Sequence, residues 1–327
     1  MARIGISFDG FTTTSEAIAL AKASVEAGAQ SLWVAEQLGY REAIATCTAF
    51  ALTAPGPTVV PTAVSPYLWH PTPTAMAMAT LDELAPGRAA IALGVGNPLF
   101  LAESGHSLDK PIPVMRDYID ALRRLWNGEA VHMESRTFKL AGARLAFKPN
   151  PIPVYIAAMG PDMLKTTGRI ADGVVLSAGL STRSVKESLA QVAAGAEAEG
   201  RDSKTLRRAG YIFFGASHDA KQAIDAVRLK VAFVMRNKFL GANIKASGIP
   251  IDHEAVIAAI ARRDMAAACA LVPDEAVEEF GIAGTPEHCA KRLRDFIDAG
   301  LDEPVLGLLG TPENCRLGLD VIRRVGA

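Results

Sequence analysis

The stretch VYIAAMGPDMLKTTGRIADGVVL, residues 154–176, contains a complete strand–helix–strand pattern. The apolar run 154–158 predicts a strand, and Gly160-Pro161 predicts the start of a helix, because proline fits the first helical position. A second apolar run, 173–176, follows that helix. Short apolar strands that alternate with helices are typical of a parallel sheet covered by helices.

The same alternation extends along the chain on both sides of this stretch. The clearest of the other helices, 114–126, has apolar residues three or four positions apart, and a further helix at 15–27 is expected to end at Gly28. Eight strand–helix units favour a closed (β/α)8 TIM barrel over an open, doubly wound sheet. The predicted strands are 4–8, 31–35, 58–63, 89–93, 154–158, 173–176, 209–214 and 304–309.

All 327 residues are predicted to form a single barrel domain, 1–327, since no stretch resembles a linker between domains. Three segments are too long for simple connections and are predicted to be insertions, near 97–113, 127–153 and 241–284. The last of these is expected to be mainly helical. Insertions in a barrel usually belong to the loops around the active site.

Composition excludes several classes of function. The chain has 34 Lys+Arg and 35 Asp+Glu, a net charge of −1, which argues against a nucleic-acid-binding scaffold. No run approaches the ~18 uncharged apolar residues that span a bilayer, and the first residues do not resemble a signal peptide. The 4 cysteines and 6 histidines are too scattered for a disulfide framework or a metal site. We therefore expect a cytoplasmic protein with a small-molecule ligand and no nucleic-acid, membrane or metal partner.

Polar side chains that directly follow predicted strands are the candidates for a site, because barrel active sites lie at the carboxyl ends of the strands. Asp172 and Asp302 precede their strands and are predicted to be structural. The candidates at carboxyl ends are Asp9, Glu36, Ser65, Asn97 and Ser177.

The helix start at Gly160 is a candidate anion site. Small residues let a ligand approach the backbone, and the amides of a first helical turn can bind a phosphate. A phosphate there would contact Met159, Gly160 and the amides of Asp162 and Met163. The same sequence is also typical of an ordinary proline-led helix start without a ligand. Both interpretations stay open at this point.

His70 also has two interpretations. It precedes a predicted helix and either hydrogen-bonds the helix start or acts as a proton donor beside the third strand. The related stretches GTPEHC (284–289) and GTPENC (310–315) predict two helix starts in which Thr is the N-cap and Pro follows it. GVGNP (94–98) is not a dinucleotide motif, because Leu99 stands where the pattern G-x-G-x-x-G requires glycine.

Together these motifs resemble the bacterial luciferase-like flavin and deazaflavin oxidoreductases. The most specific segment is IAAMGPDMLKTTGRIADGVVLSAG, 156–179. Within the family, 231–252 and 261–293 are similar to the methylenetetrahydromethanopterin reductase branch, which uses the deazaflavin coenzyme F420. The resemblance implies a TIM barrel with the isoalloxazine-type ring at the carboxyl ends of its strands, and a homodimer. Further similar segments are 27–43, 61–71, 80–96 and 118–131.

The resemblance also implies particular contacts to the coenzyme. The family positions that bind the coenzyme phosphate match Ala158, Met159, Gly160 and Asp162. The ring is expected to be supported near Thr62-Ala63 by a bulge with a non-prolyl cis peptide. Ser65 matches a coenzyme-contacting position and Glu36 an acidic one. The predicted cofactor-binding residues are thus Thr62, Ala63, Ser65, Asn97, Ala158, Met159, Gly160, Asp162 and Ser177.

The sequence departs from the family pattern at several acidic positions. The reductase branch has carboxylates at the positions of Ser7 and Asn97, where they are implicated in proton delivery to the pterin. The family's sugar-phosphate dehydrogenases have His where this chain has Gln37, and Glu where it has Leu99. Their substrate is therefore not expected here. Asp9 lies two residues beyond Ser7 on the same side of the strand, which makes it the leading substitute acid.

We therefore predict an oxidoreductase that transfers a hydride between coenzyme F420 and an organic substrate, with Glu36, Asp9 and His70 as its catalytic, proton-transferring residues. Two alternatives stay open: an FMN-dependent luciferase-like monooxygenase, and a non-catalytic flavin- or deazaflavin-binding protein on the same fold. The loops 97–113 and 241–284 are expected to shape the substrate pocket.

Overall fold

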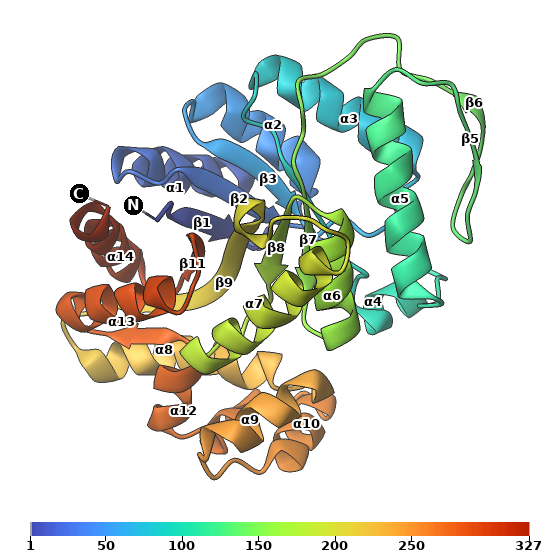
Figure 1. Ribbon diagram of the computed structural model, residues 1–327. Coiled ribbons are helices and arrows are strands. Elements are labelled where there is room, and N and C mark those ends of the chain that lie inside the picture. Colours follow the sequence, from blue (N-terminus) through green and yellow to red (C-terminus); the bar gives the residue numbers. More distant parts are fainter. Residues whose placement is uncertain (1, 327) are drawn as a thin grey trace.

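Eight parallel strands curve into a barrel (Figure 1). A computed structural model describes residues 2–326, except for the side chain of Leu99. The comparison of Leu99 with the Glu of the sugar-phosphate dehydrogenases therefore lies outside the described residues. The strands are β1 (Gly5–Phe8), β2 (Ser31–Ala35), β3 (Thr58–Thr62), β4 (Ile91–Leu93), β7 (Val154–Ala158), β8 (Gly173–Leu176), β9 (Arg207–Ala216) and β11 (Glu303–Leu308). They pair in the order β3-β2-β1-β11-β9-β8-β7-β4, and parallel bridges from Val59 to Ala89 and from Val64 to Leu93 join β3 to β4. The predicted TIM barrel and its eight strands are confirmed.

Helices surround the barrel and connect successive strands (Figure 1). The helices around the barrel are α1 (Thr14–Glu26), α2 (Ala43–Thr53), α3 (Pro71–Leu84), α5 (Pro111–Trp126), α6 (Pro161–Ile170), α7 (Thr182–Glu197), α8 (Ala220–Val234), α13 (Pro286–Asp298) and, after the last strand, α14 (Pro312–Val325). Local sequence sets their ends. Gly28, with φ of 92°, follows the last residues of α1, and Thr285 and Thr311 cap α13 and α14 ahead of a proline, as predicted.

The three predicted insertions differ in structure. The first contains the short helix α4 (Pro98–Glu103), and the second an antiparallel hairpin of β5 (Val131–Glu134) and β6 (Lys139–Ala143) that projects beyond α5 (Figure 1). The third is helical, as expected, but ends in a strand, β10, that the sequence did not reveal. Its elements are α9 (Gly241–Ser247), α10 (His253–Ala261), α11 (Met265–Ala270), α12 (Asp274–Phe280) and β10 (Ile282–Gly284), which pairs with the last residues of β9.

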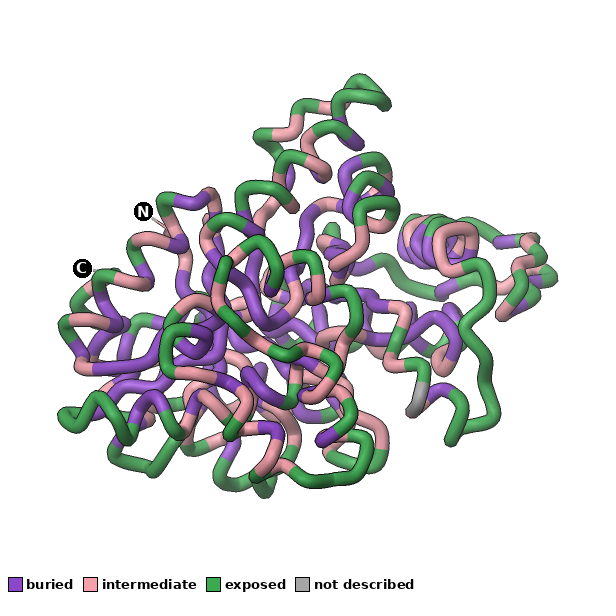
Figure 2. The backbone as a smooth tube through the Cα atoms, turned by 90° about the horizontal axis from the view of Figure 1, so that it is seen from below, coloured by how far each residue is buried: buried purple, intermediate pink, exposed green. Residues whose placement is uncertain are grey.

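Both faces of the barrel strands are buried, which explains why the strands read as nearly continuous apolar runs. Inside the barrel, Trp33 and Tyr155 lie edge to face with ring centres 5.2 Å apart. The outward side chains of the strands, such as Ile6 and Leu32, pack against the helices in the main hydrophobic core. A second apolar cluster joins α8 to the helices of the third insertion. Figure 2 shows this buried backbone at the centre and exposed backbone around it.

The aspartates that precede strands are structural, as predicted. Asp172 accepts the Val154 N–H at 2.9 Å and pairs with Arg123. Asp302 accepts the Arg208 N–H at 2.8 Å. Within residues 2–326, no helix is both long and apolar enough to cross a membrane.

Two glycines bring α6 and α7 into very close contact. A Cβ atom at Gly168 would stand 2.0 Å from the Val192 carbonyl oxygen, and one at Gly195 would stand 2.0 Å from the Lys165 carbonyl oxygen. No side chain fits between these two backbones. Because α6 and α7 both border the candidate site described below, this contact also fixes the width of the site.

We expect Gly195→Ala to lower the free energy of unfolding by about 1–3 kcal/mol, because the added methyl group must push α6 and α7 apart. At an exposed helical position the same substitution would stabilise the helix by up to about 1 kcal/mol, so the sign of the effect is diagnostic. Urea unfolding of both proteins measures it, with Lys186→Ala on the exposed side of α7 as the control. A more stable Gly195→Ala protein would contradict the close contact.

Candidate functional site

Two cavities lie at the carboxyl ends of the barrel strands. The first, which we call the α6 cavity, has a volume of about 270 Å³ and lies between the start of α6, α7 and the segment 239–243. The second, the Glu36 cavity, has a volume of about 220 Å³ and is lined by residues after β2, β3 and β4 and by Arg236. Of the predicted site residues, the α6 cavity contains Ala158, Met159, Gly160 and Ser177, and the Glu36 cavity contains Glu36, Ala63, Ser65 and Asn97.

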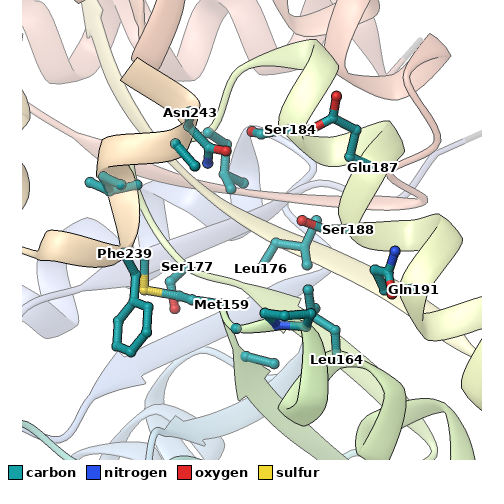
Figure 3. A pocket seen from close by; sticks show the side chains of 16 residues that line it. Met159, Leu164, Leu176, Ser177, Ser184, Glu187, Ser188, Gln191, Phe239 and Asn243 are labelled. Atoms are coloured by element: carbon teal, nitrogen blue, oxygen red, sulfur yellow. The ribbon is translucent and has the colours of Figure 1, made fainter. Parts of the chain in front are cut away.

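The α6 cavity contains an open helix start. Gly160 is the N-cap of α6 and Pro161 follows it, and no side chain caps the helix. A Cβ atom at Gly160 would meet nothing within 4 Å, so space lies beside the amides of the first turn. Uncapped amides at the positive end of a helix, together with hydroxyl and amide side chains, suit an anion such as a phosphate. Figure 3 shows the polar walls of the cavity: Ser184, Ser188 and Gln191 on α7, and Asn243 across from them.

Glu36 directly follows β2 and is held in place by hydrogen bonds. Its backbone N–H donates to the Thr62 carbonyl at 2.7 Å, and its carboxylate accepts the Ala43 N–H at 2.9 Å and a bond from the Trp69 side chain. Burial raises the pKa of Glu36; the Ala43 N–H partly offsets this rise, and the neighbouring Glu42 adds to it. A half-buried carboxyl group with a raised pKa at the mouth of a barrel is suited to proton transfer.

The non-prolyl cis peptide that the family resemblance implied is present at the end of β3. The Thr62-Ala63 peptide bond is cis, and Ala63 lines the Glu36 cavity. Gly94, just after β4, lies against it: a Cβ atom at Gly94 would stand 2.7 Å from the Ala63 Cβ atom. Ser65 is buried here and donates to the Val95 carbonyl at 3.2 Å. Gly94 therefore lets the backbone after β4 pack directly against Ala63, at the edge of the Glu36 cavity.

Asp9 does not join Glu36. It follows β1 but is absent from the linings of both cavities. Its Oδ2 atom pairs with the Lys230 ammonium at 3.4 Å, and its Oδ1 atom accepts the Phe11 N–H at 3.1 Å. Ser7, on the same side of β1, is hydrogen-bonded to Tyr211, and burial raises the pKa of that phenol. The carboxylate proposed as a substitute acid is thus engaged by a lysine and by its own loop.

The other predicted residues outside the two linings have local roles. His70 is the N-cap of α3: its Nδ1 atom accepts the Thr72 N–H at 3.2 Å, and its side chain is exposed. This geometry agrees with the first interpretation of His70, in which it hydrogen-bonds the start of the helix. The Asp162 side chain is exposed in the first turn of α6, and Thr62 supplies its carbonyl to Glu36.

The sequence reasoning missed the segment that follows α8. Arg236 lines the Glu36 cavity, whereas Phe239 and Leu240 line the α6 cavity, and the Asn237 side chain lies 3.2 Å from the Met159 sulfur between them. The only available signal was position, because this segment follows the seventh predicted strand and its helix. The insertion expected to shape the pocket was placed a few residues later, at 241–284.

The fold and the two cavities define a TIM-barrel protein with a small-ligand site built from the carboxyl ends of its strands. A model of the luciferase-like monooxygenase family matches residues 5–303. The chain belongs to this family, and the family predicted from the sequence is therefore confirmed.

Several relatives are named for coenzyme F420 or for a pterin reductase. The 5,10-methylenetetrahydromethanopterin reductase of Methanolobus tindarius is 30% identical over 88% of each chain. The F420-dependent glucose-6-phosphate dehydrogenase of Mycolicibacterium fortuitum is 29% identical over 75% of this chain and 77% of its own.

Solved structures show the same fold over nearly the whole chain. The coenzyme F420-dependent tetrahydromethanopterin reductase of Methanopyrus kandleri superposes with a TM-score of 0.89 at 24% identity, covering 99% of this chain and 97% of its own. An F420-dependent secondary alcohol dehydrogenase in complex with an F420-acetone adduct gives a TM-score of 0.82 at 21% identity, covering 99% and 98% of the two chains.

We expect Trp69→Phe to raise the pKa of Glu36 further, because the indole N–H that stabilises the charged carboxylate is lost. Infrared titration of the protonated carboxyl band measures this pKa, with Glu36→Gln to assign the band. An unchanged or lowered pKa in Trp69→Phe would contradict the hydrogen bond.

Proposed function

We propose that this protein is an F420-dependent oxidoreductase that transfers a hydride between the deazaflavin coenzyme and a small organic substrate. The observation that carries the proposal is the pair of cavities at one end of the barrel. The α6 cavity suits a phosphate, and the Glu36 cavity combines open space beside Ala63 with a carboxyl group suited to proton transfer. The named relatives support F420 as the coenzyme.

In this proposal the chain binds the coenzyme by its backbone rather than by charged side chains. The amides of Asp162 and Met163 in the first turn of α6 would hold the phosphate, with the Ser188 hydroxyl on the facing wall. Ala63 and Ser65 would lie against the ring. Orientation of the reacting groups and exclusion of water are the contributions of the protein.

Glu36 completes the proton balance. When bound, the reduced coenzyme supplies a hydride, which is one proton and two electrons. Reduction of a substrate double bond requires one further proton, which the Glu36 carboxyl group donates because burial raises its pKa. The resulting carboxylate is held by the Ala43 N–H until it takes a proton from water. In the oxidation direction the same carboxylate accepts the proton.

Ser188→Asp should weaken F420 binding about tenfold, because the carboxylate of the introduced side chain would repel the coenzyme phosphate across the α6 cavity. Salt should reduce the effect. Fluorescence titration with F420 measures it, and Ala190→Asp, on an exposed position of the same helix, is the matched control. The deazaflavin fragment that lacks the phosphate tail should bind both variants equally.

A side-by-side titration with FMN separates this proposal from the monooxygenase alternative. Tighter binding of FMN than of F420, together with consumption of oxygen by the reduced complex, would contradict it. Binding of F420 without turnover of any substrate in a broad panel would instead support a non-catalytic protein.

Glu36→Gln should lower kcat for substrate reduction by about 10²- to 10⁴-fold, the usual contribution of a general acid. In the unmodified protein, reduction should slow as pH rises through the raised pKa of Glu36, because the proton to be donated is lost. The variant should lack this limb of the pH profile. His70→Asn, which keeps a helix-capping side chain, separates the two candidates. Loss of turnover in His70→Asn but not in Glu36→Gln would assign the proton to His70.

A further inference from the structure

Arg236 projects a fixed guanidinium group into the wall of the Glu36 cavity. It lies just after α8, and its Nη1 atom donates to the Phe233 carbonyl at 3.0 Å. Its Cζ atom lies 3.7 Å from the centre of the Phe233 ring. These two contacts hold the side chain on one side and occupy one of its five N–H donors.

No acid neutralises this cation. Among residues 2–326, the structure places no carboxylate oxygen within 4 Å of the Arg236 guanidinium. Burial lowers the pKa of Arg236, which is the signature of a partly desolvated charge without compensation. The acid in the cavity lining, Glu36, instead bonds the start of α2. A desolvated cation with unused donors is unfavourable in the free protein, so its partner is expected to be a ligand.

We propose that Arg236 binds a carboxylate group of the substrate inside the Glu36 cavity. This inference rests on the proposed function, in which the substrate meets the coenzyme ring, beside Ala63 and Ser65, in that cavity. A guanidinium fork matches the two oxygens of a carboxylate. The single positive charge balances a monoanion, whereas a phosphate dianion would leave excess negative charge beside Glu36. The apolar walls, which include Leu68 and Phe100, suit a short hydrocarbon body attached to the carboxylate.

The position of Arg236 separates this role from binding of the coenzyme phosphate. Three residues further on, Phe239 is 73% exposed and lines the α6 cavity. The segment 236–240 thus contributes to both cavities, but Arg236 lines the Glu36 cavity only. A variant at Arg236 is therefore expected to weaken binding of a carboxylate ligand more strongly than binding of F420, whose phosphate lies in the other cavity.

The test uses 4-fluorobenzoate as the probe and 4-fluorobenzamide as its neutral counterpart. Fluorine NMR titrations of the full chain without coenzyme give both dissociation constants. The acid should bind at least about tenfold more tightly than the amide. Arg236→Gln should weaken binding of the acid about 10- to 100-fold and leave the amide unchanged, and Arg236→Lys should restore part of the loss. Arg116→Gln, which removes a charge from an exposed position on α5, is the matched control.

Equal binding of acid and amide, or an unchanged preference in Arg236→Gln, would overturn the proposal. A tenfold weaker affinity for F420 in Arg236→Gln, with the acid preference intact, would overturn it by assigning Arg236 to the coenzyme. Circular dichroism and unfolding measurements show whether each variant is folded. If Arg236→Gln does not fold, the affinities of Arg236→Lys for the acid and the amide provide the test. These titrations contain no coenzyme, so they test the carboxylate site separately from F420 binding. If the chain binds the acid through Arg236 but does not bind F420, the proposed function is refuted and the carboxylate site is not.

Discussion

Close packing inside the barrel is the constraint on which the rest of the structure depends. Trp33 of β2 and Tyr155 of β7 come from strands that are not neighbours and meet in the interior, so the strands close around these two large side chains. Because the strands are parallel, their carboxyl ends lie on one face of the closed barrel, where they surround a common space. Glu36, Ala63 and the Gly160 helix start, which are far apart in the sequence, therefore border neighbouring cavities. The site follows from the barrel and not from any one segment.

The two cavities divide recognition between backbone and side chains. At the start of α6 an anion meets uncapped amides, and a protein with a net charge of −1 needs no cluster of basic residues to bind it. In the Glu36 cavity the acid and the cation are separate side chains that do not neutralise each other. The segment 236–240 connects the two cavities, which gives a short stretch after α8 an influence on both ligands.

Sequence reasoning succeeded where local chemistry determines structure and failed where contacts between distant segments do. The strands, the helix starts at Thr285 and Thr311 and the glycine end of α1 follow from apolar runs and capping residues. The three-residue strand β10 has no measurable periodicity and exists because the last residues of β9 extend to meet it. The pairing of Asp9 with Lys230, more than 200 residues away, is such a contact; the catalytic role of Asp9 stays a prediction. The homodimer and the cytoplasmic location stay predictions, for which sedimentation of the purified chain and fractionation of cells are the direct tests.

The sequence by itself determined the (β/α)8 order of elements, the proline-led helix start at Gly160 and the family, because each depends on residues close together in the chain. It also placed Glu36 at the end of its strand. Only the tertiary structure decided that Glu36 is half-buried beside Ala43 and Trp69, that His70 caps a helix, and that Arg236 faces the same cavity as Glu36. Desolvation and pairing of charges depend on what surrounds a group in space, and 200 residues of chain separate Glu36 from Arg236.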